Sequence, residues 1–161
     1  MTTSGPVEAE APASQRRTDL HWLAMRLFRG LGTVELEALR RHGLSLWGYD
    51  VLTEVADTPA RTQLALGRAL GLDKSKVVVV LDELESAGLV VRLPDPGDRR
   101  ARIITATPEG RKVLASAAAE LRSIEESLLN ELGAEEGERL RATLAALTGG
   151  PLLRLRETHG C

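Results

Sequence analysis

The sequence contains few of the residues that build metal sites, disulfides or aromatic cores. Aromatic side chains make up only 2% of the 161 residues, and there are one cysteine and three histidines. The single cysteine, Cys161, cannot form a disulfide within the chain, which is typical of a reducing cytosol. The histidines are scattered, so we expect no metal site and no other cofactor. They are His21, His42 and His159.

Long hydrophobic runs are also missing. No apolar segment approaches the roughly 20 residues of a membrane span, and the N-terminus lacks the apolar core of a secretion signal. We therefore expect a cytoplasmic protein that does not bind membranes. Hydrophobic residues still make up 43% of the chain, enough for one domain. Because these are mainly leucine, valine and alanine, packed helices are favoured.

Charge is distributed unevenly along the chain. The formal net charge is −2, which seen alone argues against an anionic partner. Residues 61–112, however, contain ten basic and seven acidic side chains, a net charge of +3, so the remainder carries −5. A basic segment between acidic flanks suits a protein that binds an anion such as nucleic acid. Random scatter in a short chain is the alternative, so the sequence pattern must decide.

Apolar residues recur at helical spacing before the basic segment. Residues 1–17 show no period and are predicted to be a flexible tail. Thr18 is expected to cap a helix that ends at His42-Gly43. A second helix is expected to begin at Ser45 or Leu46 and to end near Val55.

Helical spacing returns after the basic segment. Thr107 and Pro108 are typical of a helix start, and the helix is expected to continue to about Glu131. A last helix is predicted over residues 134–147. Two glycines and a proline follow, so residues 149–161 are expected to form a loose tail.

Two short helices with a tight turn between them are predicted inside the basic segment. Thr62 caps the first and Gly71 closes it, while Asp73 caps the second, which runs to about Ala87. The run Val77–Val80 favours a strand by propensity. We prefer a helix because four apolar residues form a stripe at helical spacing, with the strand as the alternative. The stripe is Val77, Val80, Leu81 and Leu84.

A β-hairpin is predicted next. Residues 89–92 and 102–105 are rich in β-branched side chains, and the turn-forming stretch 94–98 lies between them. A helix-turn-helix followed by a basic hairpin is a winged helix-turn-helix. The predicted fold class is therefore mainly α with a small β-hairpin wing, and with N- and C-terminal helices outside the DNA-binding lobe.

This fold assigns candidate roles in DNA binding. The start of the second helix enters the major groove, where Lys74, Ser75 and Lys76 supply cations and a hydroxyl. Val78 and Val79 either contact thymine methyls or pack on the neighbouring helix. Candidate contacts to the DNA backbone are Arg61, Thr62, Gln63 and Arg68, and candidate minor-groove contacts are Arg99, Arg100 and Arg102. Ordinary solvated charges are the alternative for the basic residues.

The stretch from Thr62 to Gly110 resembles the multiple antibiotic resistance regulator (MarR) family of bacterial transcription factors, over about a third of the chain. The matching motifs are Leu66–Leu72, Asp73-Lys74-Ser75, Leu84–Val90, the wing Asp95–Arg100 and Thr107–Gly110. The resemblance implies that Arg100 enters the minor groove and that Asp98 holds it in position. The chain departs from the family pattern at Gly67, where alanine is more usual, and at Val78 and Val79, where polar or basic residues are more usual.

The resemblance also implies an assembly. Helices within 18–42 and 108–148 would interlock two copies around the DNA-binding lobes at 45–106, so that 18–148 forms one domain. A two-fold dimer predicts a palindromic operator. A monomer whose terminal helices cover its own lobe is the alternative.

Family members often bind small aromatic or phenolic effectors between the dimer helices and the lobe. The resemblance therefore implies an effector pocket near the scarce aromatic side chains, although aromatics that fill a helix junction are an equally good explanation. The candidates are His21, Trp22, Phe28, Trp47 and Asp50. No thiol switch is expected, because Cys161 lies far from the first helix.

The preferred function is a homodimeric transcriptional regulator, a repressor, that binds double-stranded DNA and has no enzymatic activity. The alternative is a winged-helix module that binds another protein instead of specific DNA. An enzyme has nothing in its favour in this sequence, because no nucleophile–base pair, phosphate-binding glycine loop or metal cluster is evident.

Overall fold

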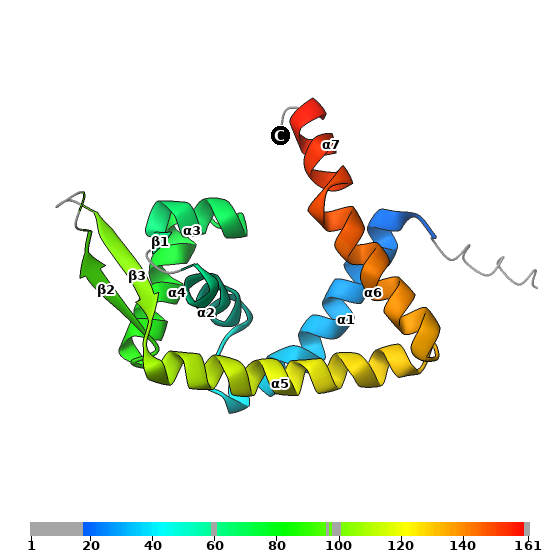
Figure 1. Cartoon of the computed structure of the whole chain (residues 1–161), viewed down its shortest axis with the longest axis horizontal. Coiled ribbons are helices and arrows are strands. Elements are labelled where there is room, and N and C mark those ends of the chain that lie inside the picture. Colours follow the sequence, from blue (N-terminus) through cyan, green and yellow to red (C-terminus); the bar gives the residue numbers. More distant parts are fainter. Residues whose placement is uncertain (1–17, 59–60, 96, 98–100, 160–161) are drawn as a thin grey trace, which may run out of the picture.

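The computed structural model describes residues 18–58, 61–95, 97 and 101–159. The predicted tail over 1–17 and the wing residues Asp98, Arg99 and Arg100 lie outside these residues. Figure 1 shows α2 to α4 and the strands gathered at one end of the molecule, and the long α5 running from them toward α6. In chain order the elements are α1 (Leu20–Arg41), α2 (Leu46–Asp57), β1 (Arg61–Thr62), α3 (Gln63–Leu70), α4 (Lys74–Ser86), β2 (Val90–Pro94), β3 (Arg102–Ala106), α5 (Pro108–Asn130), α6 (Ala134–Gly149) and α7 (Pro151–His159).

Side-chain caps determine where several helices begin. Ser45, Thr62, Asp73 and Thr107 each accept a hydrogen bond from the backbone N–H three residues further on. The prediction that Thr18 caps the first helix is wrong. Asp19 is the cap, because its carboxylate accepts a hydrogen bond from the Trp22 backbone N–H at 3.0 Å.

The hairpin belongs to a three-stranded antiparallel sheet with the order β1-β3-β2. The pairing of β2 with β3 places Val90 opposite Ala106 and Arg92 opposite Ile104. The strand β1, which pairs Arg61 with Ile104, was not predicted from the sequence. A two-residue strand is too short to show a periodic pattern. Its pairing connects the start of α3 directly to the wing.

The prediction of a loose tail over 149–161 is wrong for most of that segment. α6 continues to Gly149, and α7 runs from Pro151 to His159. Proline is favoured in the first turn of a helix, where its missing N–H is not needed. Pro151 therefore starts a helix here.

The hydrophobic core lies in the winged-helix lobe. Every buried hydrophobic side chain among the described residues falls between Ala38 at the end of α1 and Leu121 in the middle of α5. The stripe of α4 from Val77 to Leu84 belongs to this core, which explains why the valine-rich run is a helix despite its propensity. The core positions α3, α4 and the hairpin as one unit.

Candidate nucleic-acid interface

The first turn of α4 presents the predicted major-groove residues to solvent. Lys74, Ser75 and Lys76 are exposed. The Asp73 carboxylate accepts a hydrogen bond from the Lys76 backbone N–H at 2.9 Å and so occupies the positive end of the helix. An incoming anion must therefore be bound mainly by the side chains of this turn.

The two valines that interrupt the polar surface of α4 differ in exposure. Val79 is 52% exposed, whereas Val78 is less exposed and is half-buried against the lobe. The alternative in which both valines pack on a neighbouring helix therefore does not fit Val79. Its methyl groups are available to an apolar partner such as a thymine methyl.

A concavity of about 610 Å³ lies between α3, the start of α4 and the hairpin. Three of the predicted DNA-backbone residues contribute to it, together with one predicted major-groove residue and one predicted wing residue. Its apolar walls include Leu64, Leu72 and Val77. The predicted residues in its lining are Thr62, Gln63, Arg68, Lys74 and Arg102. Residues from three separate stretches of sequence thus share one cationic surface.

Gly67 explains how closely α3 approaches the turn into α4. A Cβ at this position would lie 3.0 Å from the Leu72 carbonyl oxygen and 3.6 Å from a methyl of Val77. The absence of a side chain therefore allows a tighter packing of the two helices, which offsets the weaker helix propensity of glycine.

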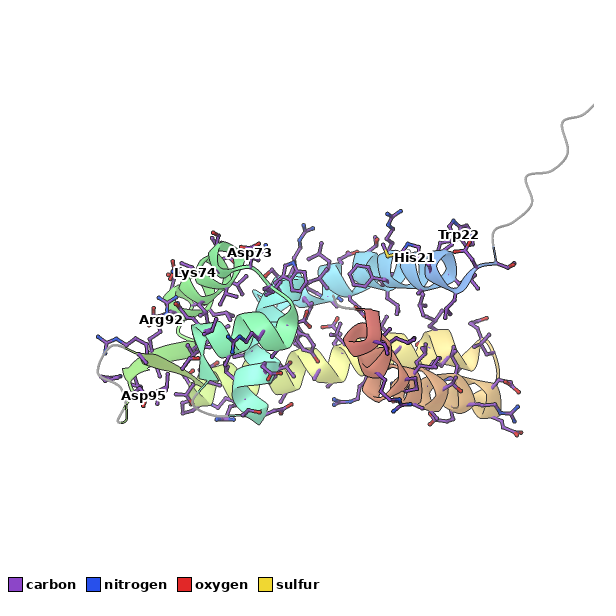
Figure 2. All side chains as sticks on the ribbon, turned by 90° about the horizontal axis from the view of Figure 1, so that it is seen from above. His21, Trp22, Asp73, Lys74, Arg92 and Asp95 are labelled. Carbon is purple, nitrogen blue, oxygen red and sulfur yellow. The ribbon has the colours of Figure 1, made fainter. Side chains whose placement is uncertain are left out.

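Local hydrogen bonds join the two sides of the wing near its tip. The Asp95 carboxylate accepts a hydrogen bond from the Gly97 N–H at 2.8 Å, and the Asp95 N–H donates to the Ala101 carbonyl at 3.2 Å. Arg102 lies exposed at the start of β3. In Figure 2, Asp95 at the base of the wing tip and Lys74 at the start of α4 lie at the same end of the molecule.

Arg92 on β2 was not among the predicted site residues. Its guanidinium donates to Asp82 at 2.5 Å and to Glu85 at 2.9 Å, both on α4. The sequence signal that would have found it is a pair of acids three residues apart on a helix, followed within ten residues by an arginine on a strand. The pairing also means that Arg92 is not available to an external anion, although it lies in the basic segment.

The predicted effector residues do not converge within one chain. His21 and Trp22 lie near the far end of α1 from the lobe (Figure 2), and the Arg26 guanidinium stacks 4.8 Å from the Trp22 ring centre. α2 packs on α1 near Gly32, where a Cβ would lie 3.8 Å from Leu46. Ten residues of helix, roughly 15 Å, separate Trp22 from that point. Phe28 is largely exposed, and Trp47 is about one-third exposed.

Asp50 lies instead in an acidic junction of α1, α2 and α5. Burial raises the pKa of the Asp50 carboxyl above its ordinary value. Burial also raises the pKa of Glu35, and the negative charges of Glu125 and Asp50 raise it further. An anionic ligand would be repelled from this junction.

Next to this junction, side chains at the end of α1 form hydrogen bonds with α5. The Glu120 carboxylate on α5 accepts hydrogen bonds from Arg41 and, at 2.7 Å, pairs with His42. The bond from Arg41, followed by that from His42, lowers the pKa of Glu120. These contacts attach the end of α1 to α5.

The part of the chain that the structure describes offers neither a metal site nor a membrane span. No group of three or more histidine, cysteine, aspartate or glutamate side chains is placed there to hold a metal ion. None of the described helices combines the length and apolarity needed to cross a membrane.

Comparison with known proteins relates this arrangement to transcriptional regulators. A family model described as the MarR family matches residues 42–101, which include α2 to α4 and β2 and end just before β3. The transcriptional regulator HosA of Escherichia coli O111:H- is 39% identical over 90 residues, which are 56% of this chain and 67% of HosA.

Solved structures extend the similarity beyond the lobe. The transcriptional repressor CouR bound to a 23-mer DNA duplex is 30% identical, with a TM-score of 0.72 over 81% of this chain and 92% of CouR. CouR from Rhodococcus jostii RHA1 bound to p-coumaroyl-CoA is 28% identical, with a TM-score of 0.68 over 81% of this chain and 91% of CouR.

Proposed function

Since this chain belongs to the MarR family of transcriptional regulators, we propose that it is a cytoplasmic repressor that binds a palindromic DNA operator as a homodimer. The observation that carries the proposal is the cationic concavity, in which α3, α4 and the wing contribute Arg68, Lys74 and Arg102 to one surface. The DNA-bound structure of the relative CouR supports the same use of this fold.

In the proposed complex the first turn of α4 lies in the major groove. Lys74, Ser75 and Lys76 reach base edges and phosphates, and Val78 and Val79 meet thymine methyls. The wing lies over the adjacent minor groove, where Asp98 holds Arg100 and where Arg99 and Arg102 add positive charge. Backbone contacts by Arg61, Thr62, Gln63 and Arg68 fix the register of the protein on the duplex.

Exposed leucines support the homodimer. α6 leaves Leu140, Leu144 and Leu147 at least one-third exposed, and α1 does the same for Leu20, Leu23 and Leu27. Two helices with unburied apolar side chains, at the end of the molecule away from the core, suit a second copy with the same surface. The terminal helices 18–42 and 108–148 would then be the dimer part of the domain.

A small aromatic effector would bind near the junction of α1, α2 and α5 and loosen the hold on DNA. Trp47 supplies an aromatic surface there and Asp50 an acceptor. The acidic character of this junction favours a neutral phenol, whose hydroxyl donates to Asp50, over a carboxylate. His21, Trp22 and Phe28 join such a pocket only if the second copy brings them close.

A gel-shift experiment tests the proposal. The purified chain is titrated into duplex DNA from the region upstream of its own gene, with an unrelated duplex of equal length as the control, at low and at physiological salt. We expect retention of the upstream duplex at lower protein concentration than the control. No retention of either duplex at low salt would contradict DNA binding and favour the protein-interaction module.

A further inference from the structure

We propose that Arg92 is a positioning residue that sets the angle of the wing against α4, so that the wing reaches the minor groove when α4 occupies the major groove. The inference rests on the proposed function, because it concerns how the same DNA-binding surface is assembled. It assigns a role to a residue that makes no contact with DNA.

The clamp consists of Arg92, Asp82 and Glu85. Asp82 and Glu85 are three residues apart and so lie on one side of α4, and the guanidinium of Arg92 reaches both, at 2.5 Å and 2.9 Å. Arg92 lies opposite Ile104 in the β2–β3 pairing, two residues before Pro94 at the end of β2. Among the described residues, the clamp is the polar contact between α4 and the hairpin that lies nearest to the wing tip.

The connection between α4 and β2 explains why a clamp is needed. Three residues, Ala87 to Leu89, separate the two elements, and Gly88 adopts a left-handed conformation with φ of 71°. The Thr107 hydroxyl donates to the Gly88 carbonyl at 2.8 Å and fixes the base of the hairpin. The core residues Val90 and Ile104 hold the hairpin up to the level of Arg92, which lies opposite Ile104. Further out, the inclination of the strands against α4 depends on Arg92.

The clamp differs from an ordinary surface ion pair in the low exposure of its arginine and in the number of carboxylates that this arginine bonds. The Arg92 side chain is 21% exposed, whereas those of Asp82 and Glu85 are 57% and 40% exposed. A planar guanidinium that bonds two carboxylates restricts direction as well as distance. Loss of both carboxylates leaves the charge of the partly buried Arg92 uncompensated.

The same pairing excludes a direct role for Arg92 in binding phosphate. Arg92 lines the concavity together with Arg68, Lys74 and Arg102. Both of its terminal nitrogens already donate to carboxylates, whereas no ion pair involves Lys74 or Arg102 among the residues that the structure describes. Arg92 therefore acts through the wing.

Two variants with opposite changes of charge test the inference. Arg92→Gln removes a positive charge from the clamp, and the double variant Asp82→Asn/Glu85→Gln removes two negative charges from it. If charge alone mattered, the first would weaken DNA binding and the second would strengthen it. The clamp predicts that both weaken it, by roughly tenfold, because both release the wing. Glu83→Gln, on the same helix but outside the clamp, is the control and should bind at least as tightly as wild type.

The binding measurement uses a duplex selected by the wild-type chain from a random DNA library, with hydroxyl-radical footprinting as the second readout. We expect both clamp variants to keep protection where α4 binds and to lose protection in the flanking minor groove. Opposite changes of affinity in the two variants, or unchanged flanking protection, would overturn the inference. The acid variant alters only exposed carboxylates, so it remains informative if Arg92→Gln fails to fold.

Failure of the proposed function has a different signature. If the wild-type chain selects no DNA, the repressor proposal fails and the inference fails with it. If the wild type binds and the clamp variants bind in the same way, the inference alone fails.

Discussion

The two ends of this molecule bury their apolar side chains to very different extents. The described core lies in the winged-helix lobe and in the parts of α1 and α5 that pack on it, with Leu52, Leu66 and Leu81 fully inaccessible to solvent. The other end, formed by the start of α1, the end of α5, and α6 and α7, leaves many leucines exposed. The core around the lobe is buried within one chain, whereas the terminal helices leave an apolar surface exposed, as the proposed homodimer requires.

This contrast suggests that the lobe and the terminal helices have different functions in the proposed dimer. A packed lobe holds α4 and the wing at a fixed spacing, which reading two adjacent grooves requires. Helices that pack against a second copy set the distance between two lobes, which the half-site spacing of an operator requires. A small molecule that alters the packing of α1, α2 and α5 would act at the boundary of the two regions.

The largest expected effect is that of a methyl group at the start of α5, where this helix packs on the base of the wing. A Cβ at Gly110 would lie 2.0 Å from the Leu89 carbonyl oxygen, so Gly110→Ala must displace backbone at the base of the wing. We expect a loss of about 3 kcal/mol or more in the free energy of unfolding, measured by chemical denaturation with circular dichroism.

Gly30→Ala is the matched control in the other region. Nothing lies within 4 Å of a Cβ at Gly30 in α1, so the same substitution should gain about 0.5–1 kcal/mol by helix propensity. Equal destabilisation by both changes would contradict the contrast between a packed lobe and open terminal helices.

The second prediction concerns the assembly. Leu140→Glu combined with Leu144→Glu places two charges on the exposed apolar side of α6. If a second copy covers that side, the dissociation constant of the dimer should rise about 100-fold or more, as measured by analytical ultracentrifugation. Leu64→Glu in the lobe, where the leucine is also exposed, should leave the dimer intact. Unchanged self-association of the α6 variant would exclude this surface from the interface.

The third prediction concerns DNA binding by the wing, which is measured separately from dimer formation. Arg100→Ala should weaken operator binding by about 1–3 kcal/mol and leave the dimer unchanged, because a minor-groove arginine contributes to binding alone. Fluorescence anisotropy with a labelled duplex measures the first, and sedimentation the second. Wild-type affinity of the variant would refute the role of the wing.

The smallest expected effect is a pH dependence at the boundary between the regions. Because the pKa of Asp50 is raised in the folded chain, the folded state holds its proton at higher pH than the unfolded state, whose ordinary value is 3.8. Folding stability should therefore increase as pH falls from neutrality through the raised pKa, and no further gain is expected below 3.8. Asp50→Asn should flatten this part of the profile.

Neighbouring groups set the limits of that pH experiment. Glu35 adds a contribution of the same sign, since its pKa is also raised. Glu120 adds the opposite sign below its ordinary value of 4.5, since its pKa is lowered by Arg41 and His42. Glu125 is paired with Arg141 at 2.9 Å. Thermal denaturation of wild type and Asp50→Asn from neutrality down to the ordinary Glu120 value of 4.5 separates the raised groups from Glu120, and identical slopes would contradict the assignment to Asp50.

The sequence predicted the lobe well because its signals are local. Caps at Thr62 and Asp73, the left-handed Gly71, and the apolar stripe of α4 each depend on a few neighbouring residues. The short β1, the helix after Pro151 and the clamp at Arg92 were missed. The strand β1 and the clamp at Arg92 depend on contacts between distant segments. The helix α7 was missed because Gly149, Gly150 and Pro151 were interpreted as the end of regular structure, whereas Pro151 is the first residue of a new helix.

The sequence predicted many residues of the candidate site, but not how the fold brings them together. Thr62, Gln63, Arg68, Lys74 and Arg102 were proposed from separate motifs, and their common concavity depends on the pairing of β1 with β3. The predicted effector residues behave differently, because the fold of one chain does not bring their aromatic side chains together. Trp22 and Trp47 are close in the sequence, but the length of α1 keeps them apart in one chain.

The molar mass of the protein–DNA complex tests the central claim most directly. The wild-type chain is mixed with its selected duplex, and the mass is measured by light scattering during size-exclusion chromatography. Complete lobes joined by terminal helices predict two chains on one duplex. A complex with one chain per duplex, or no complex at low salt, would contradict the account.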